Sequence, residues 1–79
     1  MRHGDYTHNF AADWRGFREQ ECLSQPQLAE KIGCSVRTVQ GVESGAHRPN
    51  FTNRLRFMAL VRARDEREEL RRRVRGEEA

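Results

Sequence analysis

Apolar side chains in the first part of the chain recur with the period of an α-helix. Phe10, Trp14 and Phe17 stand four and three positions apart, which places them on one face of a helix. We expect this helix to run from about residue 10 to residue 21. Residues 1–9 show no such pattern, and we expect them to form a flexible arm.

Two short helices are predicted next, each with a recognisable start and end. Ser24 and Gln27 form the S-x-x-Q capping box of a helix start, and Gly33 can take the left-handed conformation that ends a helix. Ser35 is the N-cap of the following helix, which Gly45 ends. Two short helices around a glycine-containing turn form a helix-turn-helix unit. Their apolar faces consist of Leu28, Ala29 and Ile32, and of Val36, Val39 and Val42.

A fourth helix is predicted to follow Asn50, its N-cap, and to continue into a charged tail. We expect its buried stripe to consist of Phe51, Leu55, Met58 and Val61. From residue 62 onward almost every residue is Arg or Glu. No segment has the alternating pattern of a strand, so the predicted fold class is all-α with a charged C-terminal helical extension.

Composition narrows the classes of function that remain. The chain has 79 residues, of which 35% are hydrophobic and 34% charged, so one small domain is expected. We place it at residues 10–61, followed by a helical tail at 62–79. So small a core cannot build the walls of a usual substrate cleft, and we expect no enzyme. All but one of the 15 basic residues are arginine and the net charge is +3, which favours an anionic partner such as nucleic acid.

Targeting, redox and metal signals are weak. No apolar run approaches the length of a membrane span, and the first residues lead into no apolar signal segment, so we expect a cytoplasmic location. Cys22 and Cys34 are too few for a disulfide framework and lie outside metal-ligand spacings. We expect free thiols in a reducing compartment, with no metal and no cofactor. His47 is interpreted as a surface residue.

The order of residues from Leu23 to Pro49 is more specific than any single motif in it. It reads L-S-Q-x-x-L-A-x-x-I-G-C-S-x-x-T-V-x-x-V-E-x-G-x-x-x-P. This pattern resembles the Cro and phage-repressor type of helix-turn-helix, the XRE family, over residues 10–61. The resemblance implies a bundle of four or five helices in which the third helix lies in the major groove of double-stranded DNA.

The outward face of the third helix supplies the candidates for reading bases. The positions that do not point into the core are Val36, Arg37, Gln40 and Gly41. Arg37 could bond O6 and N7 of guanine, and Gln40 could bond N6 and N7 of adenine. Either could instead hold a phosphate. Val36 could contact a thymine methyl or seal the core edge, whereas Gly41 would allow the backbone to approach DNA closely.

Candidates for contacting phosphates surround this helix. Helix N-termini offer free N–H groups that suit a phosphate, and the resemblance implies that Gln25 contacts the DNA backbone and braces the third helix. The loop before the fourth helix is expected to supply a second clamp. The complete set is Ser24, Gln25, Ser35, Thr38, Arg48 and Asn50. Ser24 could be no more than a cap, and Ser35 is needed first as one.

Two further features concern structure and assembly. Arg18 and Glu43 match positions that form an ion pair beneath the DNA-binding surface in several relatives, although two solvated charges would fit the sequence as well. In the tail, a heptad spacing interrupted by Arg67 predicts a short dimer seam or a solvated helix. The apolar seam positions are Leu60, Ala63, Leu70 and Val74.

These observations predict a sequence-specific transcriptional regulator. We expect an autoregulating repressor that binds an inverted-repeat operator as a homodimer. The alternative is an antitoxin-type interaction module that neutralises a partner protein and also binds DNA. An RNA-binding role is less well supported, because helix-in-groove reading requires the wide major groove of B-form DNA.

Overall fold

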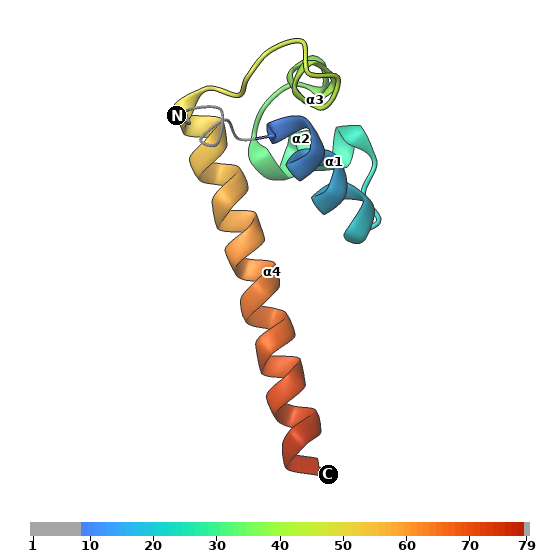
Figure 1. Cartoon of the computed structure of the whole chain (residues 1–79), viewed down its shortest axis with the longest axis vertical. Coiled ribbons are helices and arrows are strands. Elements are labelled where there is room, and N and C mark those ends of the chain that lie inside the picture. The colour runs from blue at the N-terminus through green and yellow to red at the C-terminus, as the bar shows by residue number, and fades with distance from the viewer. Residues whose placement is uncertain (1–8, 79) are drawn as a thin grey trace, which may run out of the picture.

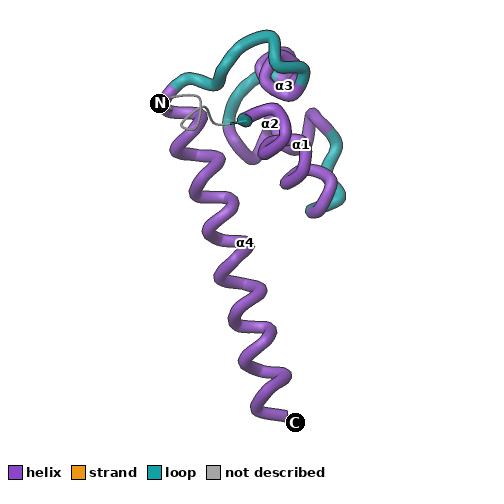
Figure 2. The backbone as a smooth tube through the Cα atoms, viewed as in Figure 1, coloured by secondary structure: helices purple, strands orange, loops and turns teal. Residues whose placement is uncertain are grey.

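The computed structural model describes residues 9–78, and helices account for most of them (Figure 1). The helices are α1 (Phe10–Gln20), α2 (Gln25–Ile32), α3 (Val36–Glu43) and α4 (Phe51–Glu78). Only loops and turns connect them in this described part of the chain, as Figure 2 shows, so the all-α fold class is confirmed. The arm predicted before Phe10 lies, apart from Asn9, outside the described residues.

Local hydrogen bonds start α1 and α2. The Asn9 side chain accepts from the Ala12 N–H at 3.1 Å. The capping box of α2 is complete: the Gln27 N–H donates to Ser24 Oγ at 3.2 Å, and the Ser24 N–H donates to Gln27 Oε1 at 2.8 Å. Gly33 ends α2 at φ 87°, in the left-handed region that glycine tolerates best.

Similar signals bound α3 and start α4. Ser35 Oγ accepts from the Thr38 N–H at 3.1 Å, and Gly45 has a φ of 83° just beyond the end of α3. Asn50 Oδ1 accepts from the Asn53 N–H at 2.7 Å, which is the N-cap bond predicted for the fourth helix. α1 ends one residue earlier than predicted, because Cys22 takes a left-handed φ of 57°.

The core lies between the three short helices and the first half of α4. Phe57 of α4 stacks on Trp14 with ring centroids 5.3 Å apart, and it meets Phe17 edge-on at 5.4 Å. Aromatic pairs at these separations add to the stability that burial alone provides. The other buried apolar residues are Leu28, Ala29, Ile32, Val39 and Val42.

The predicted buried stripe of α4 is wrong in three of its four positions. Phe51, Leu55 and Met58 are 65%, 49% and 55% exposed. Val61 alone packs against the core as predicted. Phe51, Leu55 and Met58 do form a stripe, but it lies on an exposed face of α4 beside the face that packs into the core.

Another face of α4 makes the contact with the bundle. Asn53 and Phe57 are buried, and Leu60 packs against the core together with Val61. Positions 53, 57, 60 and 64 also follow helical spacing, so two overlapping stripes compete in the sequence. The Trp14 and Phe17 rings select the stripe that contains Phe57.

Two arginines fasten the middle of α4 to the end of α1. Arg64 donates to Gln20 Oε1 at 2.6 Å, and its guanidinium lies 5.2 Å from the centre of the Phe17 ring. Arg67, the interruption in the predicted seam, donates to Glu21 at 3.1 Å. These side chains bind within the chain, and they end the contact between α4 and the bundle.

Beyond this contact α4 projects away from the other helices (Figure 1). Leu70 and Val74 are exposed there, by 61% and 46%, and Ala63 is exposed as well. Leu60 differs from these three predicted seam residues, because its side chain packs against the core of its own chain. Leu60 therefore has an intramolecular contact, and its place in a dimer seam stays a prediction.

Candidate nucleic-acid interface

The helix-turn-helix unit consists of α2, the three residues that follow it, and α3. Val39 and Val42 anchor α3 in the core, whereas Arg37 and Gln40 are exposed. At about 100° per residue, the face opposite the two valines carries Arg37, Gln40, Gly41 and Ser44. Val36 lies between the two faces and is half-buried against the core. α3 thus presents an outward face that includes three of the four predicted base-reading positions.

A buried carboxylate holds the C-terminal end of this helix. Glu43 is 6% exposed and receives a bidentate ion pair from Arg18 of α1. Arg18 Nε donates to Oε2 at 2.8 Å, and Nη2 donates to Oε1 at 3.0 Å. The hydrogen bonds with Glu43 raise the pKa of Arg18 above its ordinary value, against the opposing effect of desolvation. The two residues paired in the sequence analysis are therefore in contact, and the guanidinium stays charged at any physiological pH.

Further donors surround the same glutamate. Gln25 Nε2, at the start of α2, donates to Glu43 Oε1 at 3.1 Å. Arg15 Nη2 donates to the Glu43 backbone carbonyl at 3.1 Å, and Arg18 Nη1 donates to the Leu23 carbonyl at 3.2 Å. We call Arg15, Arg18, Gln25 and Glu43 the α1–α3 brace. It fixes the first residue of α2 and the last residue of α3 relative to α1.

The sequence analysis missed one member of the brace and anticipated the bracing role of another. Arg15 was not singled out, although it precedes Arg18 by three positions and so lies on the same side of α1. The resemblance implied that Gln25 contacts the DNA backbone and braces the third helix, and its amide does contact Glu43 at the end of α3. The contact with the DNA backbone stays a prediction. The amide of Gln25 has a second N–H, so the contact with Glu43 and a contact with DNA are compatible.

Several predicted phosphate contacts are also structural groups. Ser24 and Ser35 are both N-caps, and Thr38 Oγ1 lies 3.0 Å from Ser35 Oγ. Asn50 caps α4 through its oxygen. Arg48 is exposed, and its guanidinium lies 5.7 Å from the centre of the Phe10 ring. These residues surround the helix-turn-helix unit on the loops and helix ends where the sequence placed them.

His47 is exposed, as the sequence analysis expected of a surface residue, and it also lies against α3. A side chain at position 41 would collide with the imidazole of His47. The loop folds back on the helix through backbone bonds, since the Ala46 and His47 N–H groups donate to the Gly41 carbonyl at 2.9 and 3.4 Å. His47 therefore covers the position that was predicted for close approach of DNA. A glycine inside a helix, where alanine is favoured, is the signal that could have indicated such a neighbour.

The remaining chemistry of the described residues is sparse. None of the described helices is both long enough and apolar enough to cross a membrane. Within residues 9–78, no group of three or more His, Cys, Asp or Glu side chains is placed to hold a metal ion. Cys22 is exposed and Cys34 is half-buried, and burial raises the pKa of the Cys34 thiol. Neither thiol is in a disulfide.

The fold and this surface define a helix-turn-helix DNA-binding protein. Two short helices meet at a tight turn, and the second of them, α3, is held by the α1–α3 brace and exposes its outward face to solvent. A comparison with protein-family models gives a match to the Helix-turn-helix domain family over residues 10–74. The chain belongs to this family. Comparisons with curated proteins and with solved structures give no match.

Proposed function

We propose that this protein is a sequence-specific transcriptional regulator of the Cro and phage-repressor type, which acts without catalysis and without a cofactor. The observation that supports it most strongly is the exposed face of α3 above the α1–α3 brace. A helix whose end is fixed by such a brace can enter a groove without losing much conformational freedom, because its orientation is already set. Such a regulator acts where the DNA is, in the cytoplasm of a prokaryotic cell.

Base reading is assigned to the outward face of α3. Within the described part of the chain, Arg37 and Gln40 have no side-chain partner that would compete with a base. Arg37 therefore reads a guanine, and Gln40 reads an adenine or holds a phosphate. Val36 is half-buried and can offer only the edge of its side chain to a thymine methyl. Gly41 contributes to this face by leaving room for the imidazole of His47, which lies where a side chain at position 41 would be.

The DNA backbone is assigned to the ends of the helices and to the loop before α4. The N-termini of α2 and α3, capped by Ser24 and Ser35, present N–H groups to phosphates. Gln25 adds its second amide hydrogen, and Thr38 its hydroxyl. Arg48 and Asn50 form the second clamp. The large share of arginine predicts that affinity falls steeply with salt, since each neutralised phosphate releases counterions.

Residues 10–61 form the DNA-binding domain in this proposal, and 62–79 form its helical tail. Two copies bind an inverted repeat with their recognition helices about 34 Å apart, one turn of the duplex. A dimer bound at its own promoter excludes polymerase, and repression then needs no chemical step. The concentration of the protein thereby regulates its own expression.

A second candidate function follows from the free end of α4. Leu70 and Val74 are exposed on a helix that extends past the bundle, a shape that a partner protein could grip. An antitoxin that neutralises a small toxin and also binds DNA would use such a segment. Co-purification of a small partner, and arrest of growth when this gene alone is removed, would favour the antitoxin over the repressor.

Footprinting on the DNA directly upstream of the gene tests the proposed function. The purified full chain is expected to protect a palindrome. The logarithm of its affinity should fall linearly with the logarithm of the salt concentration. Arg71→Ala removes an exposed charge from the distal part of α4 and serves as a control that should leave the footprint unchanged. Uniform protection with no preferred sequence would overturn sequence-specific regulation.

A further inference from the structure

An imidazole occupies the outward face of α3 at a position where the helix itself has no side chain. Gly41 is one of the residues on this face, and a β-carbon built there would collide with His47. The atom of His47 nearest to that place is Nε2, followed by Cδ2 and Cε1, so the tip of the ring fills it. The outward face therefore has a side chain at this position, and that side chain belongs to the loop that follows α3.

The loop holds this imidazole in place through hydrogen bonds with the backbone of Gly41. The Gly41 carbonyl accepts from the Ala46 N–H at 2.9 Å and from the His47 N–H at 3.4 Å. Ser44 Oγ donates to the same carbonyl at 3.1 Å. These bonds fix the loop against α3 without using the imidazole, so the ring is positioned before any ligand arrives, which lowers the entropic cost of binding.

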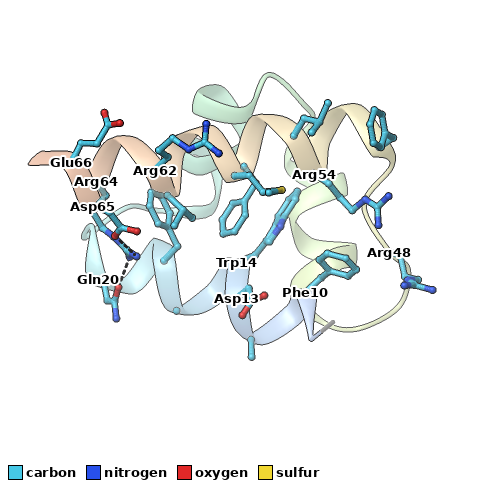
Figure 3. A pocket seen from close by; sticks show the side chains of 18 of the residues that line it. Phe10, Asp13, Trp14, Gln20, Arg48, Arg54, Arg62, Arg64, Asp65 and Glu66 are labelled. Atoms are coloured by element: carbon cyan, nitrogen blue, oxygen red, sulfur yellow. Dashed lines mark hydrogen bonds and ion pairs between the residues drawn. The ribbon is translucent and has the colours of Figure 1, made fainter. Parts of the chain in front are cut away.

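The two exposed side chains at the end of this loop contact different helices. Arg48 lies beside Phe10 of α1, at the edge of the groove between α1 and α4, with its guanidinium 5.7 Å from the ring centre (Figure 3). His47 is exposed on α3, and within residues 9–78 neither nitrogen of its ring has a hydrogen-bond partner. The fold therefore leaves the imidazole with a donor and an acceptor that the chain itself does not use.

The place that the ring occupies is in line with Arg37, the residue assigned to guanine. Four residues of an α-helix turn through about 400°, so position 41 lies within about 40° of Arg37 around the axis. It also lies about 6 Å further along the axis, at 1.5 Å per residue. Base pairs of B-form DNA repeat every ~3.4 Å, so a side chain at this place faces a different base pair from Arg37. If Arg37 faces base edges, the imidazole faces them too.

We propose that His47 reads DNA in place of a side chain on α3, by donating an imidazole N–H to N7 of a purine in the major groove. The inference rests on the proposed function, since it assigns one more base contact to the same surface. A neutral imidazole has one N–H donor, and N7 of guanine or adenine is an acceptor. Cytosine presents a donor in the major groove instead, and thymine a methyl group beside its acceptor. His47 therefore selects a purine at one base pair, distinct from the base pair that Arg37 reads.

Selection from a library of random double-stranded DNA by the purified full chain, followed by titration of the selected duplexes, tests this contact. His47→Ala should lose the purine preference at one base pair and bind the duplex that wild type selects roughly fivefold to tenfold more weakly, because one hydrogen bond is lost. His47→Gln keeps an amide N–H and should retain more of the preference than alanine does. The preferences at all other base pairs, including the one that Arg37 reads, should stay as in wild type.

A second variant displaces the ring without removing it. Gly41→Ala puts a methyl group where the imidazole lies, so the ring must move aside. We expect the same base pair to lose its purine preference, and little further loss when Gly41→Ala is combined with His47→Ala. Arg71→Ala, on the exposed distal part of α4, is the control that should leave the selected sequence and the affinity unchanged. His47 is exposed and its loop is held by the backbone, so His47→Ala should keep the circular dichroism and unfolding transition of wild type.

The outcomes separate this inference from the proposed function. A uniform loss of affinity in His47→Ala with an unchanged sequence profile would mean that the imidazole holds a phosphate, and an unchanged affinity would mean that it only covers Gly41. Either result overturns base reading by His47 and leaves the sequence-specific regulator standing. A purine preference that survives in Gly41→Ala would overturn the inference as well, since the ring would then read DNA from another place. A wild-type chain that selects no preferred sequence would instead contradict the proposed function itself.

Discussion

Glu43 and Glu69 each face an arginine, and the two glutamates have opposite surroundings. Glu43 and Arg18 lie in the α1–α3 brace, with side chains 5% and 19% exposed and a shortest contact of 2.8 Å. Glu69 and Arg73 lie on the distal part of α4, more than 60% exposed and 3.5 Å apart. The first pair joins distant segments and is shielded from water, whereas the second joins neighbouring turns of one helix in solvent. The same two residue types therefore hold α3 against α1 in one region, and in the other they form only a solvated ion pair on a helix surface.

The largest expected effect is on the brace. Arg18→Ala leaves Glu43 buried with fewer donors, and we expect a loss of about 2–3 kcal/mol in the free energy of unfolding. Arg73→Ala on α4 should cost only a few tenths of a kcal/mol. Urea unfolding of both variants measures the difference. Equal losses would break the distinction between the two regions.

The next largest effect is expected on DNA binding by α3, the helix that the brace holds in place. Arg37→Ala should weaken operator binding by about 2 kcal/mol and relax the preference at one base pair, because a bidentate contact to guanine is lost. Binding to a library of operator variants measures both changes. If the affinity drops but the sequence profile stays the same, Arg37 contacts a phosphate and reads no base.

The contact between the loop and α3 should produce a smaller effect. Gly41→Ala would normally stabilise a helix by up to about 1 kcal/mol, but here the new methyl group meets His47. In a His47→Ala background the collision is removed, and the same change should become stabilising. A double-mutant cycle by thermal unfolding measures this coupling. Additive changes would show that His47 does not rest on Gly41 in solution.

The smallest effect is expected at the end of α1. Cys22 has a left-handed backbone at φ 57°, which costs a residue with a side chain about 1 kcal/mol. Cys22→Gly should recover part of this, by less than about 1 kcal/mol, because glycine also gains freedom in the unfolded chain. Denaturant midpoints of the two proteins are compared under reducing conditions. A lower midpoint for the variant would mean that the unfolded-state term dominates.

Much of the fold follows from signals that act over a few residues. Ser24, Gln27, Gly33, Ser35 and Gly45 determine the ends of α2 and α3 through caps and turns, so these ends could be predicted closely. The spacing that resembles the Cro and phage-repressor type also predicted the ion pair of Arg18 and Glu43. Caps and turns can be predicted without knowing which residues pack against each other across the core.

The features that could not be predicted from the sequence depend on distant contacts. α4 carries two stripes with valid helical spacing, and the choice between Phe57 and the exposed stripe rests on the rings of Trp14 and Phe17. Likewise, Arg15 and Gln25 reach Glu43 only after α1, α2 and α3 have packed, and His47 reaches Gly41 only through the path of its loop. Periodicity identifies which faces are possible, and packing decides which of them is used.

The position of Trp14 gives the molecule an internal optical reporter. It is the one tryptophan of the sequence, fully shielded from water and stacked on Phe57 of α4. Its fluorescence should therefore be blue-shifted in the native state and move to longer wavelength when α4 detaches from α1. The emission should therefore report the undocking of α4. The outward face of α3 lies away from Trp14, so a ligand that binds there should leave the emission unchanged.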